Sequence, residues 1–527
     1  MVSAGEGVAR QTRLGQAGLT PGDPLGGEGI PDAAPPSSVG TFLSEPRSDT
    51  GTVQPGWTAK LARWASELAP CAIPKATRSR ARHHVLDTLG AVLAGSGHPI
   101  PRMLLSSEDV QEAARGGTIL GRSGSYRFEA CALVNAVAGH VLDLDDQSYS
   151  LMGHASVVVL PAILAAAEKA RASERAALDA FVVGVEVACK LGAALSPVHF
   201  QAGWHTTATV GAFGAAAGCA RLWGLPSEGT ANAFGLIPIM AGGLRANNGT
   251  GAKSLQAGQA ALAGLRAVNL SRAGLDASRR ILEARDGFVS ATNAGAFNPA
   301  ILDALGEPFE FEAPGMMIKR YPCCSGLGAA IDAVKELTST APIPPGEILS
   351  VECRVTPLAF RSLPYQLPRT GLEGKFSAPY TVAAALIDGD VTNGTYLDDR
   401  ALDPAIRHLA RLVQLTCDET DGFAPPAGPE GATVSIKTRD GMIRTARVPQ
   451  PLGGPARPLE WGMLVDKFRL CAEPVLGPRW IEVVEHVEGL GTDEDIAGLM
   501  GAMTGQDRIT PAVSATGPGT PAPSPST

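Results

Sequence analysis

The feature that most constrains this chain is a run of charge between two apolar segments. Residues 140–156 read HVLDLDDQSYSLMGHAS, with three carboxylates within four positions and a histidine on each side. The flanks EACALVNAVAG and VVVLPAILAAA are apolar and rich in alanine, which predicts a helix, a polar loop and a second helix. Charges between buried helices are costly unless they are paired or used. The segment is therefore a candidate functional site, and the alternative is a solvated acidic loop.

The composition favours a globular chain built from closely packed helices. Of the 527 residues, 45% are hydrophobic and the mean hydropathy is +0.08, so we expect a large core and about two or three domains. Aromatic residues make up only 5%, whereas glycine, with 62 residues, and alanine are abundant. Because small side chains let backbones approach, we expect helices that pack through Gly and Ala.

Charge and cysteine content argue against several classes of protein. The net charge is −8 and the pI is about 5.7, without a basic stripe, so nucleic acid is not expected as a partner. The nine cysteines are scattered through apolar segments and form no Cys-x-x-Cys pair. This pattern favours buried thiols in a reducing compartment over disulfides or a thiolate zinc site.

The apolar runs of the sequence predict buried helices rather than membrane spans. The run at residues 206–220 is shorter than the ~20 residues that a span needs, and glycines interrupt it. The first residues lack the apolar core of a signal peptide. Arg10 and Arg13 suggest a mitochondrial transit peptide only weakly, because acidic residues accompany them. We therefore expect a cytoplasmic protein that contacts no membrane.

Hydrophobic periodicity divides the chain into a helical and a mixed part. Helical spacing runs through the first part, for example at residues 57–69 and 75–95. The pattern changes after residue 315: ILSVECRV at 348–355 alternates as a strand does, and TVSIKTRDGMIRTARV at 433–448 reads as a hairpin. From residue 458 the helical pattern returns, so the end of the folded chain is expected to pack back on the first part.

The predicted fold class is mainly α. It comprises a large all-helical domain, built from both ends of the folded chain, and a smaller α+β lid domain. The terminal segments are rich in Gly, Pro, Ser and Thr and are expected to be disordered. The predicted boundaries are 1–55 for a disordered tail, 56–314 and 451–507 for the two parts of the helical domain, 315–450 for the lid, and 508–527 for a second disordered tail.

Two local predictions concern the helical part. The segment RRILEARDGFVS, residues 279–290, is expected to form a helix that closes at Asp286-Gly287. His83 and His84 are adjacent on a predicted helix and cannot share one of its faces. We therefore interpret these two histidines as structural.

A second polar segment follows the acidic loop. His205 directly precedes a helix of small residues, whose first N–H groups favour an anion; the alternative is that His205 only caps this helix. Residues 240–257 read MAGGLRANNGTGAKSLQA and offer Arg245 and Lys253 on a Gly-rich loop. These cations fit a bound carboxylate or phosphate, although the spacing of a Walker phosphate loop is absent.

Five segments together resemble one family. They are HVLDLDDQ…GHAS, GWHTTATVGAFGAAAGCARLWGL, GTGAKSLQAGQAA with RRILEARDGF, KRYPCCSGLGAAIDA, and EGKFSAPYTVAAALIDG. In this order and spacing they resemble the MmgE/PrpD family, which includes 2-methylcitrate dehydratase, cis-aconitate decarboxylase and iminodisuccinate epimerase. The resemblance covers nearly all of residues 57–503. It implies a homodimer and metal-free, cofactor-free chemistry on a small di- or tricarboxylate in a cleft between the helical domain and the lid.

The resemblance also implies site residues and three departures. Gln147 stands where decarboxylase-like members carry Thr, Gln256 replaces a common His, and Gly328 stands where a His usually follows the Pro-Cys-Cys turn. The family's catalytic positions fall on residues of the expected type, namely Asp143, His154, His205, Lys253 and Tyr380.

Reactions of this family share the problem of charge that develops on a carbon next to a carboxylate. An enzyme can stabilise this charge with cations on the carboxylates, with an acid and a base that work near pH 7, and by excluding water. We expect His205 to be the better base, because a helix N-terminus disfavours its charged form, and His154 to be the better acid, because carboxylates lie near it. The predicted site comprises Asp143, His154, His205 and Tyr380 as catalytic residues, and Lys253, Gln147, Gln256, Arg320 (or Lys319) and Lys375 as substrate-binding residues, with no metal and no cofactor.

The reaction stays open at this point. A lyase that dehydrates or decarboxylates a citrate- or aconitate-type acid is the first hypothesis. An epimerase or other isomerase of a dicarboxylate, and a metabolite-binding or scaffold protein without activity, are the alternatives. Residues 143–146 also match the DxDD motif of class II terpene cyclases, but those enzymes need an aromatic-lined cavity. Lastly, the acidic cluster with His140 and His154 has the donors for a divalent metal.

Overall fold

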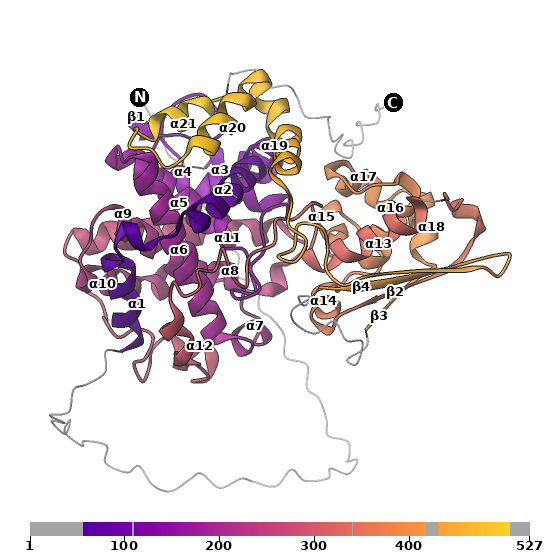
Figure 1. The fold of residues 1–527 in the computed structure, drawn as a ribbon, viewed down its shortest axis with the longest axis horizontal. Helices are drawn as coiled ribbons and strands as arrows, with labels where there is room; N and C mark the ends of the chain where they lie inside the picture. Colours follow the sequence, from indigo (N-terminus) through magenta and orange to yellow (C-terminus); the bar gives the residue numbers. More distant parts are fainter. Residues whose placement is uncertain (1–55, 108–109, 340, 418–429, 506–527) are drawn as a thin grey trace, which may run out of the picture. The chain divides into compact units, whose positions relative to one another are not determined.

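Figure 1 shows the computed structural model of the chain, which describes residues 56–107, 110–339, 341–417 and 430–505. The two terminal segments that are expected to be disordered lie outside these residues. Within the described residues the fold is mainly α, as predicted, with one four-stranded sheet. None of the described helices is both long and apolar enough to cross a membrane.

The first part of the chain forms a bundle of apolar helices. Its elements are α1 (Trp57–Glu67), α2 (Lys75–Gly95), α3 (Pro99–Leu105), β1 (Glu112–Gly117), α4 (Phe128–Val141), α5 (Ser156–Ala170), α6 (Glu174–Leu195), α7 (Val198–Gln201), α8 (Thr206–Thr209), α9 (Gly211–Leu222), α10 (Ser227–Met240), α11 (Gly251–Arg272) and α12 (Phe288–Asn293). Helices α4, α5, α6, α9 and α11 pack on one another at its centre (Figure 1). A Cβ atom on Gly184 of α6 would lie only 2.8 Å from the carbonyl oxygen of Gly214 of α9. The small residues thus permit the close helix packing that the composition predicts.

The last described segment returns to this bundle. Its helices are α19 (Trp461–Leu476), α20 (Trp480–Gly489) and α21 (Ala497–Ala502). Helix α19 packs against α2, and Phe468 on α19 is buried in the same hydrophobic core as Leu89 of α2. The prediction that the end of the folded chain packs on the first part is therefore confirmed.

The middle of the chain contains the sheet. Its strands are β2 (Ile348–Val355), β3 (Val413–Cys417), β4 (Ala432–Thr438) and β5 (Ile443–Val448), in the order β3-β2-β4-β5. Strand β2 pairs in parallel with β3 and antiparallel with β4, and β4 pairs antiparallel with β5. The predicted strand and hairpin are thus confirmed, and Gly441 in the turn has a positive φ of 88°. Helices α13 (Gly328–Ser339) and α16 (Ala378–Asp388) pack on this sheet, and α14 (Pro357–Ser362), α15 (Gly371–Gly374), α17 (Asp398–Ala401) and α18 (Pro404–Ala410) complete this part (Figure 1).

Two separate hydrophobic cores follow from this arrangement. The buried residues of the first core come from residues 61–318 and 459–503, which we call the helical region. Those of the second core come from residues 321–448, which we call the sheet region. The chain passes from one region to the other near Lys319 and returns near Pro451, so residues at these crossings can contact both regions.

One local prediction in the helical region is wrong. Residues 279–287 form turns instead of the helix expected there, and α12 begins only at Phe288. The carboxylate of Glu283 accepts hydrogen bonds from the backbone N–H and hydroxyl of Thr58, and the N–H of Phe288 donates to the carbonyl of Ile281. These tertiary and turn contacts outweigh the local helical spacing. The region is also not entirely helical, because it includes the short strand β1.

Candidate functional site

The acidic loop between α4 and α5 is buried rather than solvated. Helix α4 ends at Val141 and α5 begins at Ser156, which confirms the predicted helix–loop–helix. The side chains of Asp143, Asp145 and Asp146 are almost fully buried. Each of these carboxylates contacts a different set of partners, so each has a separate role in the loop.

Asp146 anchors the loop to the bundle. Its Oδ2 atom lies 2.6 Å from Nδ1 of His84 on α2 and also accepts a hydrogen bond from the hydroxyl of Ser156. Its Oδ1 atom accepts a bond from the backbone N–H of Ser156 at 3.4 Å. His84 is therefore a structural residue, as the sequence indicates, and its partner is one of the three carboxylates.

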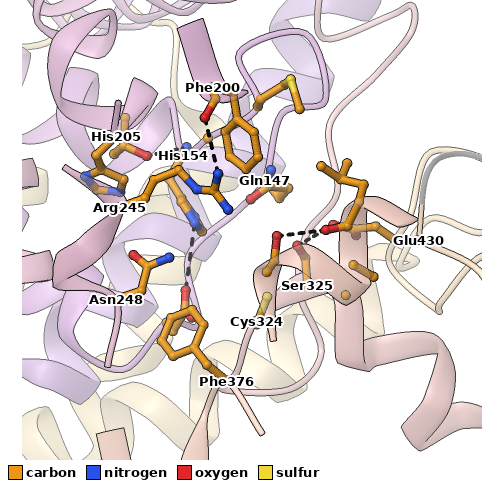
Figure 2. A pocket seen from close by; sticks show the side chains of 18 of the residues that line it. Gln147, His154, Phe200, His205, Arg245, Asn248, Cys324, Ser325, Phe376 and Glu430 are labelled. Carbon is orange, nitrogen blue, oxygen red and sulfur yellow. Dashed lines mark hydrogen bonds and ion pairs between the residues drawn. The ribbon is translucent and has the colours of Figure 1, made fainter. Parts of the chain in front are cut away.

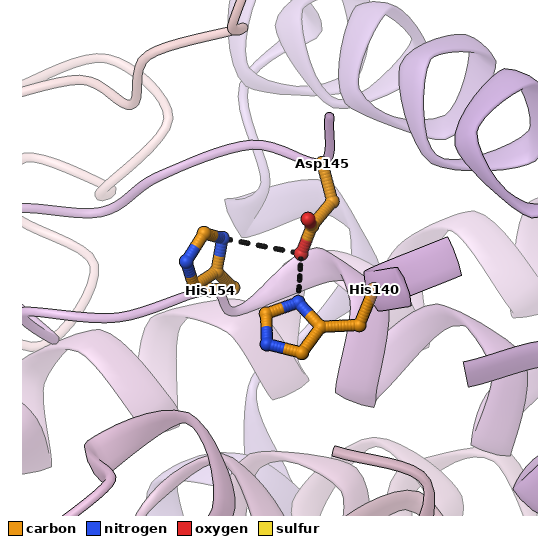
Figure 3. Close-up of side chains that lie close together, drawn as sticks. All are labelled: His140, Asp145 and His154. Atoms are coloured by element: carbon orange, nitrogen blue, oxygen red, sulfur yellow. Dashed lines mark hydrogen bonds and ion pairs between the residues drawn. The ribbon is translucent and has the colours of Figure 1, made fainter. Parts of the chain in front are cut away.

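Asp145 orients two histidines at once. Its Oδ2 atom lies 2.8 Å from Nδ1 of His140 and 3.1 Å from Nδ1 of His154 (Figure 3). Burial lowers the pKa of His140 to about 4, although Asp145 opposes this shift, so His140 is neutral at pH 7. The hydrogen bonds thus assign the task of orienting these histidines mainly to Asp145.

Asp143 holds two lysines from different regions. Its Oδ1 atom lies 3.1 Å from Nζ of Lys253 in the first turn of α11 and 2.8 Å from Nζ of Lys319 at the start of the sheet region. Burial alone would raise the pKa of Asp143, but these two ammonium groups outweigh burial and hold it well below its usual range. The residue has a positive φ of 54°, uncommon for a residue other than Gly, and its Oδ2 atom has no hydrogen-bond partner among the described residues.

The hydrogen bonds of His154 fix which of its nitrogens carries hydrogen when the ring is neutral. Its Nδ1 atom lies 2.7 Å from the carbonyl oxygen of Asp146, and a carbonyl can only accept. The Nδ1 atom therefore carries the hydrogen, and Nε2 keeps a lone pair. This Nε2 atom lies 3.8 Å from Oδ1 of Asp143.

The hydrogen bonds of His205 place the hydrogen of its neutral ring on the other nitrogen, Nε2. The Oε1 atom of Gln256 accepts a hydrogen bond from the backbone N–H of Leu244 at 2.6 Å, which turns the amide nitrogen toward His205. That nitrogen lies 3.2 Å from Nδ1 of His205 and donates to it, so the neutral ring carries its hydrogen on Nε2. Burial lowers the pKa of His205 well below its usual value, with further lowering by His140 and Lys253. His205 is thus a neutral N–H donor rather than the base that the sequence suggests.

A cavity of about 260 Å³ brings these groups together with the sheet region (Figure 2). Helical-region residues and sheet-region residues line opposite sides of it. Its lining from the helical region is Asp143, Gln147, Tyr149, Met152, Gly153, His154, Phe200, His205, Thr207, Arg245, Asn248 and Lys253, and its lining from the sheet region is Cys324, Ser325, Gly326, Leu358, Ala359, Ser362, Phe376 and Glu430.

Arg245 is the cation in this lining that lacks a carboxylate partner among the described residues. Its guanidinium carbon lies 3.7 Å from the centre of the Phe200 ring, and Nη1 donates to the carbonyl of Phe200 at 3.2 Å (Figure 2). The side-chain Oδ1 of Asn248 is also buried without a hydrogen-bond partner among these residues. A carboxylate in the cavity can pair with the guanidinium at a small desolvation cost, because Arg245 is already half-buried.

The structure brings five of the nine predicted site residues to the cavity, namely Asp143, Gln147, His154, His205 and Lys253. Gln256 lies behind His205 and orients it. Lys375 follows α15, and its Nζ atom donates to the carbonyls of Leu142 and Pro322, which ties the two regions together.

Two other predicted residues lie away from the cavity. Tyr380 is fully buried in the core of the sheet region, where its hydroxyl donates to the carbonyl of Thr395. Arg320 is exposed, and its guanidinium lies over the Tyr321 ring beside a different cavity. Its neighbour Lys319, the alternative in the sequence prediction, reaches Asp143 instead.

Gly328, which stands where the resembled family usually has a histidine, also lies outside the cavity lining. A Cβ atom at this position would lie 3.0 Å from Cβ of Pro451, so a side chain there would face the crossing between the two regions. Cys324, Ser325 and Gly326 supply this part of the lining instead. The absence of a histidine at position 328 therefore removes no group from the cavity.

Sequence reasoning missed Tyr149, Ser325 and Glu430. The hydroxyl of Ser325 donates to Oε1 of Glu430 at 2.5 Å, and the hydroxyl of Tyr149 donates to Oε2 at 3.3 Å (Figure 2). Tyr149 and Glu430 are 281 positions apart in the sequence. A single glutamate before a strand carries no local signal that it will meet these two hydroxyls.

Lys467 of α19 closes the back of the acidic loop. Its Nζ atom donates to the carbonyl oxygens of Leu144 at 3.1 Å and Lys319 at 2.6 Å and pairs with the carboxylate of Asp87. Burial raises the pKa of Asp87 to about 6, although Lys467 opposes this shift. The last described helices therefore help to position both the loop and the crossing into the sheet region.

One group of side chains has the donors for a divalent cation. The group consists of His140, Asp145 and His154, and all three residues are buried (Figure 3). Each offers one possible ligand atom, and these three atoms lie within 4.8 Å of one another. Both histidines direct Nδ1 at the same carboxylate oxygen at hydrogen-bond distances, and His154 makes a further bond to the carbonyl of Asp146. Hydrogen bonds thus account for all three orientations, and a cation would have to replace them.

Comparison with known proteins identifies two family domains along the chain. The family profile of the MmgE/PrpD N-terminal domain matches residues 59–299, and that of the MmgE/PrpD C-terminal domain matches residues 321–488. The cis-aconitate decarboxylase-like protein oryM of Aspergillus oryzae is 27% identical over 476 residues, which is 85% of this chain and 97% of its own length. The cis-aconitate decarboxylases of Aspergillus terreus and Homo sapiens are each 26% identical, over 86% and 81% of this chain and 97% and 90% of their own lengths.

Proposed function

The chain belongs to the MmgE/PrpD family, and we propose on this basis that it is a lyase that removes CO2 from a small tricarboxylate of the aconitate type. The names of its relatives support the reaction class. The observation that carries the proposal is a cavity lined by two buried histidines, one with its hydrogen on Nδ1 and the other with its hydrogen on Nε2, together with a guanidinium that has no carboxylate partner among the described residues.

The proposed chemistry assigns each group a task. Arg245 binds a carboxylate of the substrate, with Asn248 beside it, and holds the chain of the substrate against the histidines. Neutral His205 donates from Nε2 to an oxygen on which negative charge develops as the carbon–carbon bond breaks. His154 accepts or returns a proton at Nε2, where its lone pair lies. Burial of the side chains of Asp143, His154 and His205 lowers the local dielectric constant and strengthens these interactions.

Asp143 and its two lysines set the charge of the site. Two ammonium groups share the one carboxylate of Asp143, so neither lysine is fully neutralised by it and both can attract an anionic substrate. In the free protein Lys253 is paired with Asp143 and is therefore less available as a clamp than Arg245. Gln256 acts through His205, and Gln147 lines the cavity beside His154.

The proposal is tested by NMR of the purified protein with cis-aconitate, citrate and related acids in D2O. We expect release of CO2 and one deuterium on the carbon chain of the product. Deuterium exchange without net conversion would replace the proposal by an isomerase, and loss of water would replace it by a dehydratase. Binding without any turnover would leave a metabolite-binding protein.

Arg245→Gln is expected to weaken binding of the acid more than it lowers kcat. Loss of a charge-assisted hydrogen bond costs roughly 1.5–3 kcal/mol, which is about one to two decades in Kd. Calorimetry with a slow substrate or a carboxylate inhibitor measures the change. Arg320→Gln is the matched control, because this exposed guanidinium lies at another cavity. If Arg245→Gln kept its affinity and Arg320→Gln bound the acid more weakly, Arg320 rather than Arg245 would be the residue that binds the carboxylate.

Activity is expected to survive prolonged treatment with EDTA. The predicted absence of a metal rests on the resemblance, and hydrogen bonds account for the orientations of His140, Asp145 and His154. Turnover is measured before and after chelation and after addition of Mg²⁺, Mn²⁺ or Zn²⁺. Loss on chelation that a divalent ion reverses would make this group a metal site.

Three further predictions complete the proposal. We expect a homodimer, a cytoplasmic location, and a lid with boundaries near residues 315 and 450. Light scattering of the purified protein tests the dimer, since a monomer at working concentration would contradict it. The two separate hydrophobic cores support the boundaries of the lid.

A further inference from the structure

We propose that Glu430 is a catalytic residue, whose carboxyl group donates a proton to the carbon chain of the substrate from the sheet-region side of the cavity. This inference rests on the proposed function, because it supplies the proton that decarboxylation consumes. It concerns a residue that lies on the opposite side of the cavity from His154 and His205 (Figure 2).

The position of Glu430 is fixed by two hydroxyls. The residue is separated from the start of strand β4 only by Gly431, is 5% exposed, and lines the cavity. Ser325 holds Oε1 and Tyr149 holds Oε2, and both of these residues also line the cavity. A carboxyl group with both oxygens held in this way is oriented toward a bound substrate without a further rearrangement.

The surroundings of Glu430 favour its protonated form near neutral pH. It has no ion pair among the described residues, since Lys319 is paired with Asp143 instead. Burial raises the pKa of Glu430 to about 7; the hydroxyls of Ser325 and Tyr149 and the charge of Lys319 oppose this shift, and the charge of Asp143 adds to it. A general acid works best when its pKa lies near the working pH, so this environment suits a proton donor.

The proton balance of the reaction requires such a donor. The bond between the leaving carboxylate and the chain breaks, its electron pair passes to the chain, and CO2 departs. A carbon of the chain then takes one proton: the O–H bond of Glu430 breaks as the new C–H bond forms. The resulting carboxylate is stabilised by the hydroxyls of Ser325 and Tyr149 and regains its proton from water.

The sheet region offers few alternatives for this role. Its side of the cavity contains Cys324, Ser325 and Glu430 as the residues with exchangeable protons besides Ser362. Burial raises the pKa of Cys324 to about 12, so its thiol is a weak acid at pH 7. Glu430 is therefore the strongest acid that this side presents.

The test compares Glu430→Gln with the matched control Glu310→Gln. Glu310 is equally buried, its pKa is also raised to about 7 by burial, and it bonds the hydroxyl of Ser148, but it does not line the cavity. We expect Glu430→Gln to lower kcat by about 10²–10⁴-fold with KM within about threefold, and Glu310→Gln to keep the wild-type kcat. The kcat of the wild type and of Glu310→Gln should fall as pH rises through about 7, because Glu430 loses its proton; this fall is the alkaline limb of the pH–rate profile. Glu430→Gln should lack this limb.

Two outcomes would overturn the proposal. One is a kcat of Glu430→Gln within about threefold of the wild type. The other is persistence of the limb near pH 7 in this variant. If Glu430→Gln does not fold, Glu430→Asp replaces it, and it should keep the limb while kcat falls. A limb lost in Glu430→Asp as well as in Glu310→Gln would point to a general change of structure and reject the assignment.

A second measurement separates this inference from the proposed function. If the wild type converts none of the acids, the proposed function fails, and Glu430 is then tested in the empty protein. Carboxyl groups that are protonated at about pH 6 and ionised at about pH 8 give an infrared C=O band that titrates, and Glu310 contributes to this band as well as Glu430. We therefore expect Glu430→Gln to lose the part of the band that Glu310→Gln keeps. Identical spectra for wild type and variant would overturn the inference independently of turnover.

Discussion

Replacing either His154 or His205 with glutamine is expected to lower kcat by at least two decades while the protein stays folded. General acid–base groups typically contribute about 10²–10⁴-fold. Glutamine keeps a hydrogen-bonding side chain of similar length but cannot accept or deliver a proton at neutral pH. Steady-state kinetics measure the loss, and a thermal melt checks that each variant folds.

The two histidine variants should differ in how much kcat they lose. His205 keeps its N–H and is neutral at pH 7, because burial holds its pKa well below the usual value. The amide of His205→Gln still donates a hydrogen bond, so part of its contribution should remain, whereas His154→Gln loses the lone pair at Nε2 altogether. We therefore expect the larger loss in His154→Gln.

His408→Gln is the control for both variants. This histidine is exposed on α18, outside the cavity lining, and its replacement should leave kcat unchanged. Near-normal kcat in both site variants would contradict the assignment and move the proton transfers to other groups. A loss in His408→Gln of the same size would mean that the effect is not specific to the cavity.

The largest expected effect on stability comes from Asp143→Asn. The change removes the counter-ion of two buried lysines, Lys253 and Lys319, and leaves two ammonium groups without it. Removing one partner of a buried ion pair typically costs about 3–5 kcal/mol of the free energy of unfolding. Urea titration of wild type and variant measures this difference. Asp493→Asn, which breaks an exposed pair with Arg175, should leave stability close to the wild type.

The pH dependence of this difference follows from the depressed pKa of Asp143. A carboxyl whose pKa is lower in the folded than in the unfolded state stabilises the fold above the unfolded pKa of about 3.9 and loses this effect as pH falls toward the folded pKa. The gap between wild type and Asp143→Asn should therefore stay constant from pH 7 to about pH 4 and narrow below it. Adding Lys319→Met to Asp143→Asn should restore part of the stability, since it removes one unpaired charge. A gap that widens in acid would contradict the ion pair.

The elements of the fold could be predicted because their signals are local. Periodicity predicts α2 as far as Gly95, and the alternation of ILSVECRV predicts β2 with its observed bounds. The helix expected at residues 279–290 is wrong because Glu283 is held by Thr58, which lies 225 positions away. Spacing within a segment contains no information about such a partner.

The site could be predicted where its residues stand in polar segments that the sequence itself marks. The acidic loop contributes Asp143 and His154, the two later polar segments contribute His205 and Lys253, and all four line the cavity. The roles of the histidines depend on distant groups, because Gln256 sets the tautomer of His205 from 51 positions away. Tyr380 was expected at the site from the resemblance, yet its hydroxyl bonds the carbonyl of Thr395 inside the sheet-region core. Which way a side chain faces depends on the packing of the sheet region, and the residue type does not reveal it.

The position of Lys467 in the sequence determines when the site is completed during synthesis. Its ammonium group binds the carbonyl of Leu144, which precedes it by 323 positions, and the carbonyl of Lys319. Because a nascent chain folds from its N-terminal side, α4 and α5 can pack on the ribosome long before α19 emerges. The acidic loop therefore lacks its contact with Lys467 until the whole sheet region has been translated. The contacts of Lys467 with the loop and with the crossing into the sheet region are therefore among the last to form as the chain is made.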